Sequence, residues 1–296
     1  MECKADNCLI DFSDQVLRER LPTLLKNRTT GNNIIWATDP PPELGVDFAD
    51  EITMEQLDRI QLVPRVQKRL EEQKTRTRKK AEVFTPTHIC KKMIDLGIEN
   101  GALRTDDWKT FIEQTCLEIT CGEAPFLTSR YDTATGKMIA VPDRIGLLDR
   151  KLKAVTDQFA NDHSLWLNWA LTACMSVYGY EWQGDNLILS RANVFLTVVE
   201  NFRELFGDEL LRHRLSQQML DDIADTISWN ILQMDGLKGT VPGTDIQCVT
   251  YNWRENKKEL FYHEDIEEKD AKKKIRRKHD KMPHQDQESI LSKGEG

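Results

Sequence analysis

Three segments of the chain repeat one order of residues: a short apolar stretch, an acidic residue, and then a turn or the start of a helix. These segments are 117–127, 178–182 and 233–237, and their acids are Glu118, Glu181 and Asp235. Short apolar stretches separated by long helical sequence are typical of βαβ units, whose parallel strands end at one edge of a sheet. The order therefore predicts an α/β fold that holds a ligand at that edge.

Composition excludes several classes of protein. The chain has 296 residues, of which 30% are charged, and no apolar run approaches the length of a membrane-spanning helix. The first residues show no secretory signal, and the seven scattered cysteines with six histidines form no zinc or disulfide pattern. We expect a cytoplasmic protein with reduced thiols, no metal and no membrane association. The net charge of −8 argues against a surface covered in positive charge but leaves room for a local basic face.

The chain divides into three parts by composition. Residues 1–80 predict a mostly helical region, with helices over 1–30 and 53–80 and a short buried strand at 34–37. Residues 81–262 carry the three segments, and we expect them to form a cofactor-binding domain. Residues 263–296 are so charged that they predict a solvated helix or a disordered tail. Further helices are expected over 87–100, 144–178, 185–206 and 215–232.

The first segment has the properties of a loop that binds a nucleoside cofactor. Gly122 allows the backbone to approach a ligand closely, and a helix after it would offer unpaired amide donors. Glu118 could accept a cationic or hydroxyl group. About sixty residues separate this segment from the second one, so we expect an insertion across 130–170.

The acids of the other two segments complete this interpretation. Glu181 ends the second strand, where an acid commonly accepts the ribose hydroxyls, and Asp235 could accept the amino group of adenine. Each has a simpler alternative. Glu181 could be a half-buried strand end without a ligand, and Asp235 with Gly236 could be an ordinary turn.

Several of these motifs resemble DNA adenine methyltransferases of restriction–modification systems. The similar stretches are Ala81–Pro86, Leu117–Leu127, Tyr178–Glu181, Asp143–Arg150 and Trp182–Asn186, and the resemblance covers about 30–262. It implies an α/β fold built on a partial Rossmann-like methyltransferase sheet, with a helical N-terminal region and a charged tail. It also implies that S-adenosylmethionine is the cofactor and that its methyl group passes to the amino nitrogen of a flipped adenine, without a metal.

The resemblance also implies which residues bind the cofactor. Phe84 and Thr85 would lie near its methionine end, and Glu118 or the Gly122 backbone near the amino acid group. Glu181 would bind the ribose, with Trp182 beside the adenine and Asp235 on its amine. The full implied set is Phe84, Thr85, Glu118, Cys121, Gly122, Phe126, Glu181, Trp182 and Asp235.

The sequence departs from this family at the catalytic loop, which should read Asn, Asp or Ser, then Pro-Pro, then an aromatic residue. No such loop follows Asp235. The nearest match is Asp39-Pro40-Pro41, where Pro42 takes the place of the stacking aromatic residue. These residues are either a proline turn or a degenerate catalytic loop. The chain would therefore be truncated, or a partner chain would supply the catalytic loop and the target recognition.

A basic run suggests contact with nucleic acid. From Arg65 to Lys80 there are eight basic residues and two acids. Such a run predicts phosphate contacts with double-stranded DNA, although a solvated helix face has the same composition. The candidate contacts are Arg76, Arg78, Lys79 and Lys80.

Two other functions remain open. A catalytically inactive, methylase-like protein that binds DNA or a protein partner would account for the missing loop. A methyltransferase acting on RNA or protein would share the cofactor motifs, because these motifs do not specify the acceptor.

Overall fold

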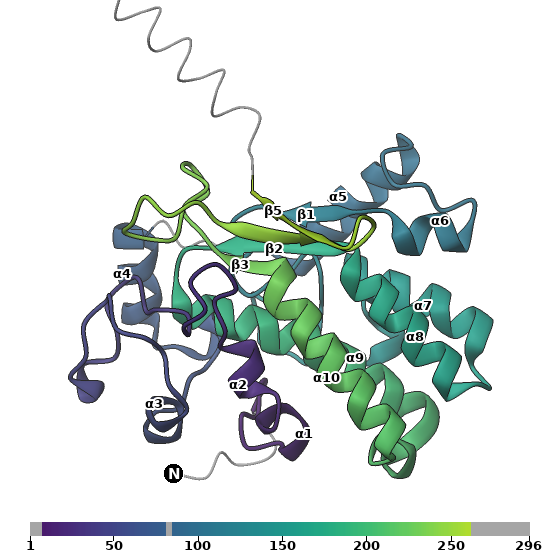
Figure 1. Ribbon diagram of the computed structural model, residues 1–296, viewed down its shortest axis with the longest axis horizontal. Coiled ribbons are helices and arrows are strands. Elements are labelled where there is room, and N and C mark those ends of the chain that lie inside the picture. Colours follow the sequence, from purple (N-terminus) through teal and green to yellow (C-terminus); the bar gives the residue numbers. More distant parts are fainter. Residues whose placement is uncertain (1–7, 81–84, 262–296) are drawn as a thin grey trace, which may run out of the picture.

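The fold is α/β and is centred on a small parallel sheet (Figure 1). The computed structural model describes residues 8–80 and 85–261. Strands β1 (Cys116–Glu118), β2 (Val177–Glu181) and β3 (Ile231–Gln233) lie in the order β1-β2-β3. Leu117 pairs with Tyr178, and Tyr180 pairs with Leu232. All three strands end at the same edge, as the sequence predicted.

Two pairs of helices form the crossovers between these strands. Helices α7 (Leu147–Phe159) and α8 (His163–Met175) connect β1 to β2. Helices α9 (Gly184–Leu211) and α10 (Arg214–Asn230) connect β2 to β3, close to the predicted bounds. The helix expected over 144–178 is two helices, because the Asp162 carboxylate caps α8 by accepting from the Ser164 and Leu165 amides.

The N-terminal region is less helical than the sequence predicted. Its helices are α1 (Gln15–Arg18), α2 (Leu21–Leu24), α3 (Met54–Arg59) and α4 (Leu70–Lys80), with 3-10 turns η2 (Pro42–Leu44) and η3 (Arg65–Gln67). The prediction of one helix over 53–80 is wrong, since α3 ends at Arg59 and Pro64 restricts the backbone before η3. Leu17, Ile34 and Trp36 join the same apolar core as α9, so this region packs directly on the rest of the fold.

The predicted strand at 34–37 belongs to no ladder. Ile35 forms an isolated bridge with Glu51. The Gln233 carboxamide replaces a neighbouring strand: its oxygen accepts from the Ile35 amide at 2.9 Å, and its nitrogen donates to the Ile35 carbonyl at 2.6 Å. A side chain at the end of β3 thus holds this segment across the strand ends.

The remaining elements are α5 (Thr87–Glu99), α6 (Trp108–Glu113), the 3-10 turn η4 (Val141–Asp143) and the antiparallel hairpin of β4 (Val249–Asn252) and β5 (Lys257–Leu260). Helix α5 confirms the prediction for 87–100. The hairpin lies along the sheet on the side away from α9, and it contacts the C-terminal end of α10 through Tyr251 and Trp229 (Figure 1). None of the described helices is both long and apolar enough to cross a membrane. The predicted tail at 263–296 lies outside the described residues.

Candidate functional site

The loop after β1 is a series of tight turns. The helix expected after Gly122 is absent, because Thr120, Gly122 and Ala124 all adopt left-handed backbone conformations with φ of 48°, 55° and 62°. A left-handed residue cannot continue a right-handed helix. The Glu118 carboxylate instead accepts from the amides of Phe126 and Leu127, each at 3.2 Å. The sequence analysis assigned the free backbone amides after Gly122 to a ligand. In the structure, the amides of Phe126 and Leu127 are bound by the Glu118 side chain at the end of β1.

This loop is strained, which is a property of binding sites. A left-handed conformation is free of cost for Gly122, but it costs about 1–3 kcal/mol at Thr120 and at Ala124. Two backbone hydrogen bonds maintain the strained loop. The Cys121 amide donates to the Tyr180 carbonyl at 2.9 Å, and the Ala124 amide donates to the Cys121 carbonyl at 2.7 Å.

Glu181 ties this loop to the end of β2. One carboxylate oxygen accepts from the Gly122 amide at 2.9 Å, and the other accepts from the Gln183 amide at 3.0 Å. The residue is 7% exposed. The glycine loop and the acid that the sequence singled out are therefore in direct contact.

Burial sets the electrostatics of the site. It raises the pKa of Glu118 to about 8, with a smaller contribution from the nearby Glu181 charge, while the two amide hydrogen bonds act in the opposite direction. Burial also raises the pKa of Cys121 well above its usual value, as do both carboxylates. Cys121 is thus a neutral thiol and a poor nucleophile. The Cys121 sulfur has room because residue 179 is a glycine. A Cβ atom at this position would lie only 3.1 Å from Sγ.

A cleft of about 290 Å³ opens beside this loop. Its walls include the predicted residues Thr85, Glu118, Cys121 and Phe126, together with Met93, Leu117, Ile119, Thr120, Pro125 and Leu147. One carboxyl group in a largely apolar cleft can hydrogen-bond a polar group on an apolar ligand. Gly122 and Glu181 are not among the residues that line this cleft. Phe84 lies outside the described residues.

Trp182 lies away from this cleft. It lines a separate cavity of about 330 Å³ with Ala37, Phe48 and Val241. Its indole nitrogen donates to the Ala37 carbonyl at 2.9 Å, which helps to hold the N-terminal segment in place.

Asp235 lies outside the cleft as well. It closes its own turn by accepting from the amides of Leu237 and Lys238 at 3.0 and 3.3 Å. Gly236 is required there, because a Cβ atom would lie 2.3 Å from the Tyr180 ring. The structure therefore gives Asp235 the turn role that the sequence had left open.

Asp39, Pro40 and Pro41 line a third groove, of about 820 Å³, beside α4. This groove shares no wall residue with the Glu118 cleft. The three residues lead directly into the 3-10 turn η2, as a proline turn would.

The basic residues of α4 are placed differently from one another. The Arg76 guanidinium is 8% exposed and pairs with Asp185 at 2.8 Å, so it does not face solvent as a phosphate contact would. Lys68 pairs with the same carboxylate at 3.2 Å. Arg78 is exposed. The side chains of Lys79 and Lys80 lie outside the described part of the structure.

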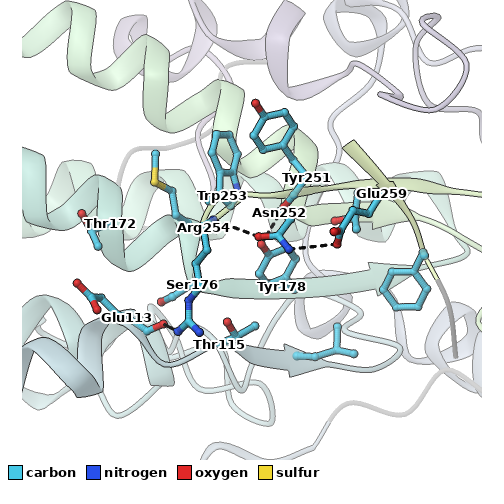
Figure 2. Close-up of a pocket in the computed structure, with 14 residues that line it drawn as sticks. Glu113, Thr115, Thr172, Ser176, Tyr178, Tyr251, Asn252, Trp253, Arg254 and Glu259 are labelled. Carbon is cyan, nitrogen blue, oxygen red and sulfur yellow. Dashed lines mark hydrogen bonds between the residues drawn. The ribbon is translucent and has the colours of Figure 1, made fainter. Parts of the chain in front are cut away.

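Sequence analysis missed a cavity of about 720 Å³ between the β4–β5 hairpin and the sheet (Figure 2). In the sequence, polar residues alternate with Tyr251 and Trp253. This alternation indicates a strand with one polar face, since alternate residues of a strand share one face. Within the described residues, no group of three His, Cys, Asp or Glu side chains is arranged to hold a metal ion.

Comparisons with protein-family models, with curated proteins and with solved structures find no match to this chain. The geometry of the sites is therefore the basis for assigning a function.

Proposed function

We propose that the chain binds S-adenosylmethionine at the carboxyl ends of β1 and β2. We further propose that it is the cofactor-binding portion of a methyltransferase that acts on the amino group of adenine in DNA. The observation that supports this most strongly is the 2.9 Å hydrogen bond from the Gly122 amide to Glu181, which joins a strained glycine turn to a buried acid on the neighbouring strand. Parallel α/β sheets bind nucleoside ligands at this kind of edge.

Each residue of the site has a role in this proposal. The Glu181 carboxylate, at the end of β2, accepts the ribose hydroxyls in this proposal. The Glu118 carboxyl group lies in the cleft where the cationic methionine end would bind. Gly122 presents no side chain and lets the ligand approach the backbone. When bound, the cofactor supplies an electrophilic methyl group, and the protein's own contribution is to position it.

We also propose that a partner chain completes the enzyme by supplying the acceptor loop and target recognition. The sequence after Asp235 has no Pro-Pro motif, and Asp39 lies in another groove. Strand β1 is at an edge of the described sheet. An edge strand can pair through its backbone with a strand of another chain.

Calorimetric titration of the full chain with S-adenosylmethionine tests the cofactor site. Glu181→Ala removes a charge-assisted hydrogen bond of about 1.5–3 kcal/mol, so we expect the dissociation constant to rise at least tenfold. Glu204→Ala, at an exposed position on α9, is the matched control and should bind like the unmodified chain. If the unmodified chain shows no binding at millimolar cofactor, the proposal fails. Equal affinity for Glu181→Ala would remove the ribose role.

A second measurement addresses the partner chain. Transfer of a labelled methyl group to double-stranded DNA by the purified chain alone would show that no partner is required. Transfer that depends on an added methylase subunit would support a split enzyme.

A further inference from the structure

The β4–β5 hairpin presents a polar face to the sheet, which is unusual for packed strands. Thr250 and Asn252 of β4, with Glu259 of β5, line the cavity of about 720 Å³. They share one face because Thr250 pairs with Glu259 and Asn252 is two residues further on. Facing sheets normally bury interdigitated apolar side chains. Here Leu117 on the floor of the cavity is still 44% exposed. The interface is a hollow whose wall carries polar side chains among apolar ones.

Aromatic residues in the wall of this hollow are held in fixed orientations. The Tyr178 hydroxyl donates to the Tyr251 carbonyl at 3.0 Å, and the Trp253 indole donates to the Asn230 side chain at 2.8 Å. The rings of Tyr251 and Trp253 are in contact, with centroids 4.5 Å apart. Phe261 forms part of the wall beyond Glu259. Because Tyr251 alternates with Asn252 along β4, its ring lies on the other face of the hairpin, together with Trp253 (Figure 2). Tyr178 is therefore the ring that can pack on a planar ligand beside Asn252.

The polar groups at the centre are also held in place. Figure 2 shows the Asn252 amide between Arg254 and Glu259, near the ring of Tyr178. The Asn252 nitrogen donates to Glu259 at 3.2 Å, and its oxygen accepts from the Arg254 amide at 3.1 Å. The Arg254 guanidinium donates to the Glu113 carbonyl at 2.9 Å across one end of the cavity.

These groups define the chemistry of a ligand. An amide side chain has two donor hydrogens and two lone pairs. The Asn252 oxygen also accepts from the Glu255 amide at 3.1 Å, so Asn252 keeps one donor beyond these bonds. Lys257 pairs with Glu259 and lowers the pKa of that carboxyl, which stays ionised and acts only as an acceptor. The Asn252 donor beside the Glu259 carboxylate complements a ring nitrogen next to an exocyclic amino group.

We propose that this cavity binds a nucleobase that carries an exocyclic amino group. The ring packs on Tyr178 and Leu117, and the amino group is directed to Glu259. The carboxylates of Glu113 and Glu259 line the cavity with a single arginine, so the site favours an uncharged base over a phosphate. The base could belong to a free nucleoside or be unpaired in a single strand. This inference does not depend on the proposed cofactor site.

Calorimetry with nucleosides tests the site. We expect adenosine to bind at least tenfold more tightly than inosine, which has a carbonyl in place of the amino group. Glu259→Gln replaces one carboxylate oxygen with an amide donor and should weaken the binding of adenosine at least tenfold. Glu209→Gln is the control, because Glu209 is exposed on α9 and lies outside the cavity wall. Asn252→Asp removes the amide donor and should also weaken binding, and circular dichroism verifies that each variant folds.

Two further measurements separate this site from the cofactor cleft and identify the source of the base. Adenosine titrations in the Glu181→Ala chain report on the cavity alone, and Glu259→Gln should leave the affinity for S-adenosylmethionine unchanged. A single-stranded oligodeoxyadenylate is compared with its abasic equivalent. Binding of the oligonucleotide but not of adenosine, lost in Glu259→Gln, assigns the site to unpaired bases. The proposal is overturned if neither adenosine nor the oligonucleotide binds. It is also overturned if Glu259→Gln and Asn252→Asp bind both ligands as tightly as the unmodified chain does.

Discussion

The Gly122 amide donates to the Glu181 carboxylate at 2.9 Å, although 59 residues separate them in the chain. The parallel pairing of β1 with β2 creates this contact, because it brings the ends of both strands to one edge. Glu181 therefore shapes the loop in addition to any role in binding a ligand. Substitutions at either residue should affect the cleft more than the global fold.

Gly122→Val is expected to weaken the binding of S-adenosylmethionine at least tenfold, because it places a branched side chain in the loop at a φ of 55°. Gly45→Val is the control, since Gly45 has a φ of 65° with open space around it and lies far along the chain from the loop. The left-handed backbone costs both variants about 1–2 kcal/mol of folding free energy. Equal calorimetric affinities for the two variants would rule out close approach of the ligand to Gly122.

The raised pKa of Glu118 predicts that the free energy of unfolding depends on pH. Its pKa is about 8 in the folded chain, above the ordinary value of 4.5, so the folded state keeps a proton that the unfolded state releases. Its contribution to stability is fully present below about pH 4.5 and is lost as the pH rises toward 8. Glu118→Gln should flatten the dependence of unfolding free energy on pH in this window, measured by urea denaturation. A slope identical to that of the unmodified chain would contradict the raised pKa.

Arg191 is predicted to be a major contributor to stability. Its guanidinium is 1% exposed and donates to the carbonyls of Leu24, Lys26, Ser228 and Ile231, and burial lowers its pKa to about 9. Arg191→Met leaves these carbonyls without that donor and should cost about 3 kcal/mol or more. Arg18→Met, which breaks a half-exposed pair with Asp58, should change stability by about 0–1 kcal/mol. Urea denaturation distinguishes the two, and similar losses would show that Arg191 has no special role.

Arg76 and Arg78 should respond differently to mutation. If α4 contacts DNA, Arg78→Gln lowers the affinity and reduces the slope of log K against log salt by about 1. Arg76→Gln removes one partner of Asp185 inside the fold, so it should lower the unfolding temperature and leave the salt slope unchanged. Fluorescence anisotropy with labelled duplex DNA measures both. An unaltered affinity and slope for Arg78→Gln would remove α4 from the DNA-binding surface.

Local sequence predicted the strands and helices wherever the pattern was long and uniform. Helices α5, α9 and α10 lie where expected, because apolar periodicity over many residues outweighs single interruptions. The three short strands were found from the apolar stretch before each acid. The failures occur at residues whose conformation depends on distant partners. Ala124 adopts a left-handed backbone, and Ile35 bonds to the side chain of Gln233.

The sequence by itself determined that the chain is α/β and that Glu118, Gly122 and Glu181 are associated with the strand ends. These features follow from short-range order along the chain. Tertiary structure alone decided that Glu181 holds Gly122, that Arg76 is buried against Asp185, and that Asp235 closes its own turn. It also placed Asn252 and Glu259 around a cavity. The reason is physical: hydrogen bonding and burial depend on the distance between groups in space, and that distance is set by the packing of the whole fold.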